Sequence, residues 1–309
     1  MAAGAPDGEA RLALGAGVSC YLVWGFVPLV FQTIGHMGVG SWEILSHRVL
    51  WSLPTAAVLV ALAGQGRQLL TALKTPRTLA WLSLSSLLVA TNWVVFIWAV
   101  NTGKVLESAL GYYIIPLVNM AAGALLFRER IDKTGYAAMG LAAIGVALQA
   151  VALGGVPVVS LVLALSFGGY GIVRKRVAAD AQTGFLVECV MVGLPALAYV
   201  LWLAQHGQGH FGAHPAVTAW LVAVGPMTAV PLVLFAWAAR RIPLSAMGFL
   251  QFLSPTIGFF IGLAEGEAFT PLRALSFLFI WGGAAIYLWG AWTRARSVRL
   301  AIAEATPAE

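Results

Sequence analysis

Charged residues are scarce in this sequence. Only 10% of its 309 residues are Asp, Glu, Lys or Arg, while 60% are hydrophobic. A water-soluble particle of this size needs more polar surface than these residues supply, so the composition excludes an ordinary soluble domain. Lipid must cover most of the chain. We therefore predict an all-α integral membrane protein.

The sequence also lacks the motifs that would give it chemistry of its own. It has no His-Glu-x-x-His motif, no cluster of carboxylates and no Walker motif, which argues against a membrane-embedded enzyme and against direct use of ATP. Its two cysteines, Cys20 and Cys189, fall in apolar stretches and are typical of small buried side chains, not of a disulfide. We predict no cofactor and no bound metal.

Ten apolar stretches are present instead. Most are about 20 residues long, the length that a helix needs to cross a hydrocarbon core roughly 30 Å thick. They lie at residues 12–32, 44–63, 78–100, 105–127, 134–153, 157–173, 183–205, 216–239, 244–264 and 271–292.

A short connection at 154–157 divides these ten predicted helices into two sets of five. An odd number of helices per set means that the second set enters the membrane upside down, which is the arrangement of many transporters. We therefore predict two inverted five-helix repeats, at 12–153 and 157–292. Short tails at 1–11 and 293–309 flank them.

The basic residues are distributed unevenly between the two ends of the predicted helices. Fifteen of the 18 Lys and Arg residues fall on one side, only Lys104 and Arg273 fall on the other, and Arg48 lies inside the second stretch. Cytoplasmic segments carry such an excess. We predict a multi-pass protein of the plasma or inner membrane with both termini in the cytoplasm. The basic helix ends are expected to meet anionic lipid and not nucleic acid.

Comparison of the sequence with itself gives modest support for a repeat. At an offset of 139 residues, six positions are identical across the third and fourth stretches of each half, and they include Trp98 with Trp237 and Pro116 with Pro255. A mid-helix proline removes a backbone donor and clashes with the preceding turn, and the freed carbonyls need neighbouring helices or water. The prolines favour a central, partly hydrated space; an ordinary kink in a packed bundle is the alternative.

Few ionisable side chains fall at membrane depth, and each is a functional candidate because it is costly there. We predict an outer and an inner charged gate, either of which is a candidate for ion coupling. The residues are His47, Arg48 and Glu107 in the outer half and Arg174, Lys175 and Glu188 near the inner end. Static pairs that only fix helix packing are the alternative, because a buried charge needs a partner whether or not it moves.

Between the two charged layers we predict a neutral, aromatic-lined substrate cavity. Polar and aromatic side chains at intermediate depth, together with the two mid-helix prolines, define it. These residues are Trp24, Asn92, Trp93, Trp98, Tyr112, Tyr113, Pro116, Asn119, Gln251 and Pro255.

Several strings of residues are shared with one known family. They are Glu43-Ile-Leu-Ser-His-Arg48, Asn92-Trp93, Phe96-Ile-Trp-Ala-Val-Asn101, Leu106-Glu-Ser-Ala-Leu-Gly-Tyr-Tyr-Ile-Ile-Pro116-Leu-Val-Asn119 and Arg128-Glu-Arg130, followed by Arg174-Lys175, Gln182-Thr-Gly184, Glu188 and Pro255. Over nearly its whole length the chain resembles the RarD type of EamA transporters in the drug/metabolite transporter superfamily. The resemblance implies ten helices in two inverted repeats around a central cavity. One departure is Tyr113, where the family pattern leads us to expect Phe.

The leading prediction is a secondary transporter that exports a small metabolite or drug by alternating access. A passive channel or facilitator is the alternative, and a membrane-embedded enzyme is a more distant one. Proton coupling through Glu188 or Glu107, sodium coupling and no coupling all stay open. The expected partners are a small-molecule substrate, membrane lipid and, if transport is coupled to them, protons. A monomer and a homodimer are both compatible with the sequence.

Overall fold

The computed structural model describes residues 7–101, 105–152, 158–264 and 270–305, and within these ranges it is helical without any strand. The helices run in the order α1 (Asp7–His36), α2 (Ser41–Leu62), α3 (Gly66–Lys74), α4 (Pro76–Asn101), α5 (Val105–Leu125), α6 (Lys133–Ala152), α7 (Val158–Arg176), α8 (Ala181–Gln205), α9 (Pro215–Ala239), α10 (Leu244–Gln251), α11 (Leu253–Ala264) and α12 (Pro271–Ala305).

Each predicted apolar stretch corresponds to one helix, except that the ninth corresponds to two. Seven helices are long and apolar enough to cross a membrane, namely α1, α2, α4, α6, α7, α8 and α9. Three further apolar segments are shorter, at Leu110–Leu125, Leu244–Ile257 and Ala274–Gly290. The chain is therefore an all-helical protein, and its described residues contain seven clear candidates for membrane spans.

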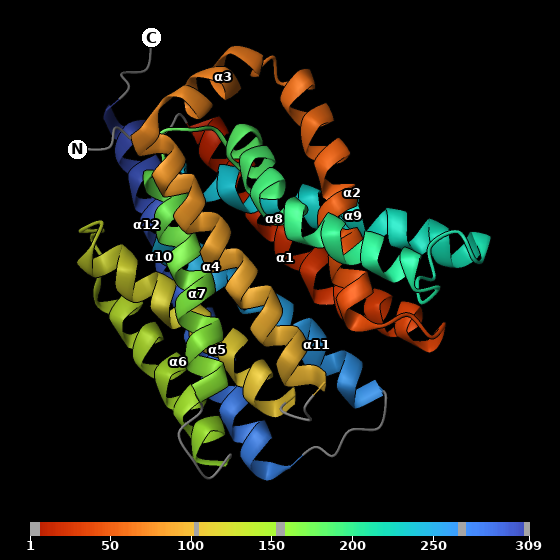
Figure 1. Cartoon of the computed structure of the whole chain (residues 1–309). Helices are drawn as coiled ribbons and strands as arrows, with labels where there is room; N and C mark the ends of the chain where they lie inside the picture. The colour runs from red at the N-terminus through yellow and green to blue at the C-terminus, as the bar shows by residue number, and fades with distance from the viewer. Residues whose placement is uncertain (1–6, 102–104, 153–157, 265–269, 306–309) are drawn as a thin grey trace.

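The helix α3 was not predicted. It has nine residues and is amphipathic, with Leu70 and Leu73 exposed and Ala72 buried. A short helix with alternating polar and apolar faces does not stand out as an apolar stretch, so a search for long hydrophobic runs passes over it. It lies at one end of the bundle between α2 and α4 (Figure 1).

The predicted stretch 244–264 is interrupted where α10 ends and α11 begins. Pro255 has no N–H, and its ring clashes with the carbonyl four residues earlier, which is that of Gln251. The helix α10 ends at this residue, and the amide of Phe252 donates to the Phe249 carbonyl at 3.3 Å, three residues back. Pro116, by contrast, lies within the continuous helix α5.

The helices pack mainly across the two halves of the chain. The extensive interfaces of the described residues are those of α6 with α12, α2 with α8 and α9, α5 with α7 and α10, α1 with α9 and α11, and α4 with α7 and α8. Each joins a helix before residue 153 to one after residue 157. Neither half therefore forms a core of its own.

This packing pattern is unchanged when equivalent helices of the two halves are exchanged. The equivalent helices are α1 and α7, α2 and α8, α4 and α9, and α5 and α10–α11. Exchange turns the contact of α2 with α9 into that of α8 with α4, and the contact of α1 with α9 into that of α7 with α4. It turns the contact of α5 with α7 into that of α10 or α11 with α1, and all these pairs are in contact. The start of α1 and the end of α12 lie at one end of the molecule, and α2, α8 and α9 spread away from α4–α7 toward the other end (Figure 1).

Two glycines allow α6 and α12 to approach closely. A Cβ atom at Gly145 would lie 2.7 Å from the carbonyl oxygen of Ser276, and one at Gly283 would lie 2.7 Å from that of Ala138. The Ser276 hydroxyl donates to the Gly145 carbonyl at 2.8 Å. Small residues at such contacts are the usual basis of close helix packing in membranes.

Candidate functional site

A buried ion pair joins α7 to α8 near the end of the bundle where α1 begins. Arg174 and Glu188 have exposed side-chain fractions of 0% and 2%, and Nη1 of the arginine is 3.4 Å from Oε1 of the carboxylate. Ser85 of α4 donates to the same oxygen at 2.5 Å, and the Tyr170 hydroxyl donates to Oε2 at 3.3 Å. The carboxylate thus receives hydrogen bonds from three side chains, which offsets the cost of its burial.

The guanidinium of Arg174 also binds the segment that connects α7 to α8. Its Nη2 donates to the carbonyl oxygens of Asp180 and Ala181, at 3.4 and 3.1 Å. A Cβ atom at Gly184 would collide with the guanidinium, so only glycine leaves room for it there. Arg174 therefore fixes the turn between the two helices as well as the charge of Glu188.

The neighbouring Lys175 has a different partner, Glu129, which lies between α5 and α6. Lys175 Nζ is 3.1 Å from Oε1 of Glu129. The same carboxylate accepts hydrogen bonds from the amides of Leu244 and Ser245 and from the Ser245 hydroxyl, at 2.7, 3.0 and 2.7 Å. Glu129 therefore caps the N-terminus of α10, a position where negative charge is favourable.

The electrostatics of Glu129 follow from these contacts. Burial by itself would raise the pKa of Glu129, but the hydrogen bonds from Ser245 and Leu244, together with the charge of Lys175, outweigh it and lower the pKa. The carboxylate therefore stays ionised at the start of α10. It ties the first half of the chain to the interrupted helix of the second.

Toward the opposite end of the bundle, Arg48 on α2 is held by three other helices. Its Nε donates to the Thr228 hydroxyl of α9 at 2.8 Å. Its Cζ lies 4.3 Å from the ring centroid of Trp93 on α4 and 5.6 Å from that of Phe31 on α1. Among the side chains that the structure describes, no carboxylate is within salt-bridge distance of this guanidinium. The side chain of its predicted partner Glu107 lies outside the described residues.

A small polar network adjoins Arg48. Asn92 donates to the Leu163 carbonyl at 3.0 Å and to the Ser166 hydroxyl at 3.2 Å, and the Tyr112 hydroxyl donates to the Asn92 side-chain oxygen at 3.5 Å. Phe96 packs against Tyr112 with ring centroids 5.6 Å apart. The structure thus brings four predicted residues together, namely Arg48, Asn92, Trp93 and Tyr112.

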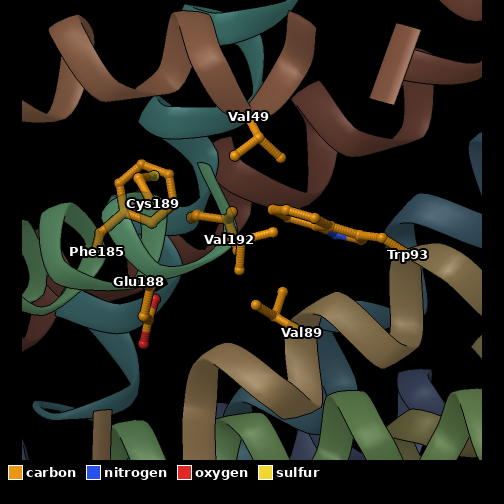
Figure 2. A pocket seen from close by; sticks show the side chains of 8 residues that line it. Val49, Val89, Trp93, Phe185, Glu188, Cys189 and Val192 are labelled. Carbon is orange, nitrogen blue, oxygen red and sulfur yellow. The ribbon is translucent and has the colours of Figure 1, made fainter. Parts of the chain in front are cut away.

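The indole of Trp93 also lines a small internal cavity, shown in Figure 2. The cavity volume is about 10 Å³, which is room for roughly one water molecule. Trp93 and Val89 enter it from α4 and Val49 from α2, facing side chains of α8 (Figure 2). The full lining is Val49, Val89, Trp93, Phe185, Glu188, Cys189, Val192 and Leu232. Trp93 therefore contacts Arg48 and shares a cavity with Glu188.

The remaining predicted cavity residues lie in other places. Asn119 donates to the Gln251 side-chain oxygen at 2.9 Å, and the Tyr113 hydroxyl donates to the Pro255 carbonyl at 3.1 Å. These two contacts, with Pro116 nearby on α5, join α5 to the interrupted helix α10–α11.

Two further predicted cavity residues are the tryptophans Trp24 and Trp98. Trp24 packs with Tyr21, Phe167 and Phe235 in an aromatic cluster whose ring centroids are 5.6 to 5.8 Å from its own. Trp98 is 45% exposed. Within the described residues, Trp24, Trp93 and Tyr112 lie in or against one hydrophobic core cluster, and Tyr113 belongs to a second.

His47 lies beneath the loop between α8 and α9. Its ring stacks on Phe211 at 4.8 Å, and both of its ring nitrogens are without a hydrogen-bond partner in the part of the chain that the structure describes. One turn away on α2, the Glu43 carboxylate accepts a hydrogen bond from the His210 backbone amide at 2.7 Å. Its other oxygen lies 2.8 Å from the ring nitrogen Nδ1 of His210. This loop is thereby attached to the start of α2.

No feature of the sequence marks the hydroxyl partners of Glu188 and Arg48. Ser85, Tyr170 and Thr228 each lie in apolar helices, where Ser and Thr hydroxyls commonly bond to their own helix backbone. Only the relative placement of helices turns them toward Glu188 and Arg48.

Comparison with known proteins gives consistent matches. A model of the EamA-like transporter family matches residues 11–151. An "Uncharacterized transporter" of Vibrio cholerae serotype O1 is 41% identical over 286 residues, covering 90% of this chain and 92% of that protein. "Protein RarD" of Streptomyces exfoliatus is 38% identical over 306 residues, covering 97% and 96%.

Two further matches are more distant. "Chloramphenicol-sensitive protein RarD" of Pseudomonas aeruginosa is 31% identical over 293 residues, covering 93% of this chain and 95% of that protein. One solved crystal structure of a protein has a TM-score of 0.66 at 18% identity and covers 89% of this chain and 96% of its own. That structure is similar in fold.

Proposed function

Because this chain belongs to the EamA family of transporters, and to its RarD type, we propose that it is a secondary active transporter that exports a small metabolite or drug. It is a multi-pass protein of the bacterial cell membrane by family and by its apolar helices. The proposal includes ten membrane spans in two inverted repeats, with both termini in the cytoplasm, and transport by alternating access.

The packing of the helices supports the repeat. An inverted repeat predicts that each contact between unlike helices has a counterpart after exchange of the halves, and the interfaces of α1, α2 and α5 with the second half have such counterparts. The shared Trp98 with Trp237 and Pro116 with Pro255 agree with this reading of the sequence.

One observation carries the mechanism. Charged groups near the two ends of the bundle, Arg48 and Glu188, both contact the same indole or its cavity. We propose that the transport path runs past Trp93, with an arginine on one side and a carboxylate on the other. In the proposed cycle Arg48 with Glu107 closes the outer end, and Arg174 or Lys175 with Glu188 closes the inner end.

We further propose that Glu188 carries the coupled proton. A carboxyl beside a cation stays ionised, whereas one moved into an apolar, cation-free setting favours the protonated form. Glu188 would release its proton when it pairs with Arg174 and take one up when the cavity faces outward. Each cycle would then exchange one entering proton for exported substrate.

Transport in proteoliposomes tests this function. A screen of metabolites by thermal shift first identifies a ligand, because a compound that binds only the folded protein raises its stability in proportion to occupancy. An imposed pH gradient should then accelerate flux of that ligand. Glu188→Gln should leave exchange intact and abolish the effect of the gradient, while Glu129→Gln, a carboxylate outside the cavity, should retain it.

Other outcomes have clear meanings. If Glu188→Gln still concentrates substrate in response to pH, Glu188 is a structural partner and the coupling site lies elsewhere. Flux that never exceeds equilibration under any gradient would favour a facilitator.

Orientation has a separate test. Gly207 and Ala178 are both exposed, at opposite ends of α8, whereas Cys20 and Cys189 are buried. In a variant lacking both native cysteines, a cysteine at Gly207 should react with an impermeant thiol reagent in intact cells, and one at Ala178 should not. The opposite pattern would overturn the proposed topology.

A further inference from the structure

The guanidinium of Arg48 is oriented without the use of most of its donors. Aromatic rings of Trp93 and Phe31 lie over it, and Nε donates to Thr228. A guanidinium carries five N–H groups, of which this contact uses one. The terminal nitrogens, with the other four, make no hydrogen bond to any side chain that the structure describes. Arg48 itself is only partly buried.

Two parallel N–H groups at the end of a fixed guanidinium match the two oxygens of a carboxylate. A cation at this depth in a membrane protein is costly unless an anion pairs with it. The nearest described acid on the same helix, Glu43, already binds the backbone and ring of His210. The donor pair of Arg48 is therefore available to the oxygens of a bound molecule.

The charge and the surroundings of the site restrict that molecule further. A single arginine balances one negative charge, whereas a phosphate monoester carries about −1.5 to −2 near neutral pH. Within the described side chains, Glu188 is the carboxylate nearest to the cluster of Asn92, Trp93 and Tyr112, since it lines the same cavity as Trp93, and it is already paired with Arg174 and Ser85. The net charge offered by the cluster and Arg48 therefore favours an anion. Trp93, Tyr112 and Phe96 surround this guanidinium with aromatic side chains, which favour a flat apolar body in the bound molecule.

We propose that Arg48 binds the carboxylate of a small, flat monocarboxylic acid, and that compounds of this class are the transported substrate. This inference deepens the transport function proposed above and rests on it. If Glu107 pairs with Arg48 in the closed outer gate, as proposed above, the substrate carboxylate and Glu107 compete for the same guanidinium. Neutralising the Glu107 side chain should then strengthen anion binding at Arg48.

Three probes of similar size test the proposal on the purified full-length protein. Benzoate, benzamide and benzylamine differ mainly in charge, and their affinities can be measured at pH 7 by titration with thermal-shift detection. We expect benzoate to bind at least tenfold more tightly than benzamide and benzylamine. Arg48→Gln should weaken benzoate binding on the order of 10- to 100-fold, the effect of losing a charged bidentate contact.

Matched variants separate charge from geometry. Arg48→Lys keeps the charge but lacks the planar fork, so its affinity for benzoate should fall between those of Arg48→Gln and the unchanged protein. Glu107→Gln should bind benzoate more tightly. Lys74→Gln on α3 removes one positive charge far from the site and should bind as the unchanged protein does. If Arg48→Gln does not fold, the comparison of the three probes on the unchanged protein still decides.

Several results would overturn the anion site: no binding of benzoate, equal binding of benzamide, or undiminished benzoate affinity in a folded Arg48→Gln variant. Failure of the transport function looks different. Benzoate that binds through Arg48 but is not moved in proteoliposomes leaves the site standing and refutes transport of this class. A neutral or cationic ligand carried at the same rate by Arg48→Gln leaves transport standing and refutes the substrate class.

Discussion

Two arginines at opposite ends of the bundle show how one residue type serves two purposes. Arg174 is fully buried and its partners are a carboxylate and two backbone carbonyls, all supplied by the protein. Arg48 is partly buried and is held by two aromatic rings and one hydroxyl. The charge of Arg174 is therefore paired within the fold. The guanidinium of Arg48 is oriented by its neighbours, and its terminal N–H groups are left available.

The largest expected effect comes from removing the inner arginine. Arg174→Met leaves Glu188 buried without a cation and should lower the free energy of unfolding by about 3–5 kcal/mol. The double variant Arg174→Met with Glu188→Leu should recover most of that loss, because no charge is then left unpaired. Unfolding in detergent measures both. Arg48→Met is the matched variant and should cost about 1–2 kcal/mol, for one hydrogen bond and the aromatic contacts. Equal losses of unfolding free energy in Arg174→Met and Arg48→Met would contradict the difference described between the two arginines.

A smaller effect is expected from crowding the inner guanidinium without changing its charge. Gly184→Ala places a methyl group against Arg174 and should destabilise the protein by about 1–3 kcal/mol. Gly140→Ala on α6 is the control, since no atom lies within 4 Å of its Cβ position. In a helix this control should be neutral or up to about 1 kcal/mol more stable. Thermal unfolding of both variants decides whether Arg174 is held as tightly as described.

A double-mutant cycle at the outer end addresses the other arginine. If Arg48 and Glu107 pair in the closed gate, Arg48→Ala and Glu107→Ala should each impair stability or transport. The double variant should then lose less than the sum, with a coupling on the order of 0.5 to 3 kcal/mol. Strictly additive effects of the two substitutions would show that Arg48 and Glu107 do not interact. A bound ligand would then be the remaining candidate partner for Arg48.

The smallest effect concerns the solvent-accessible inner pair and depends on pH. The pKa of Glu129 is lowered below its ordinary value of 4.5 in the folded protein. Its contribution to stability is therefore complete above about that value and is lost as the pH falls through the lowered folded pKa. Between pH 6 and 3 the unchanged protein should lose more thermal stability than Glu129→Gln. Parallel pH curves for the two proteins would contradict the capping role at α10.

Much of the fold could be predicted because membrane helices obey a length rule. Apolar runs of about 20 residues must be helical to satisfy their backbone in lipid, so the positions of the long helices follow from hydropathy. Helix α3 escaped because its nine residues bury only one face. The two equivalent prolines differ because packing, which the sequence does not display, decides whether a proline interrupts a helix. Gly248 packs against the Pro116 carbonyl in α5, while α10 ends four residues before Pro255.

The site was predictable in its components but not in its pairings. Arg174 and Lys175 were equivalent candidates for the ion-pair partner of Glu188, because both lie at its predicted depth in the membrane. Successive helical residues point about 100° apart. One therefore faces α8 and the other faces Glu129. The rotation of a helix about its own axis depends on its neighbours, and for the same reason Thr228 could not be assigned to Arg48.

The dependence of each half on the other constrains how the protein is made. The helices before residue 153 emerge from the ribosome without any of the extensive interfaces that hold them in the finished molecule. At a synthesis rate of about 5–20 residues per second, the second half follows over roughly 10–30 s. During that interval the close-packing surface of α6 around Gly145 faces lipid, insertase or membrane protease. Translation speed through the second half should therefore influence how much protein survives biogenesis.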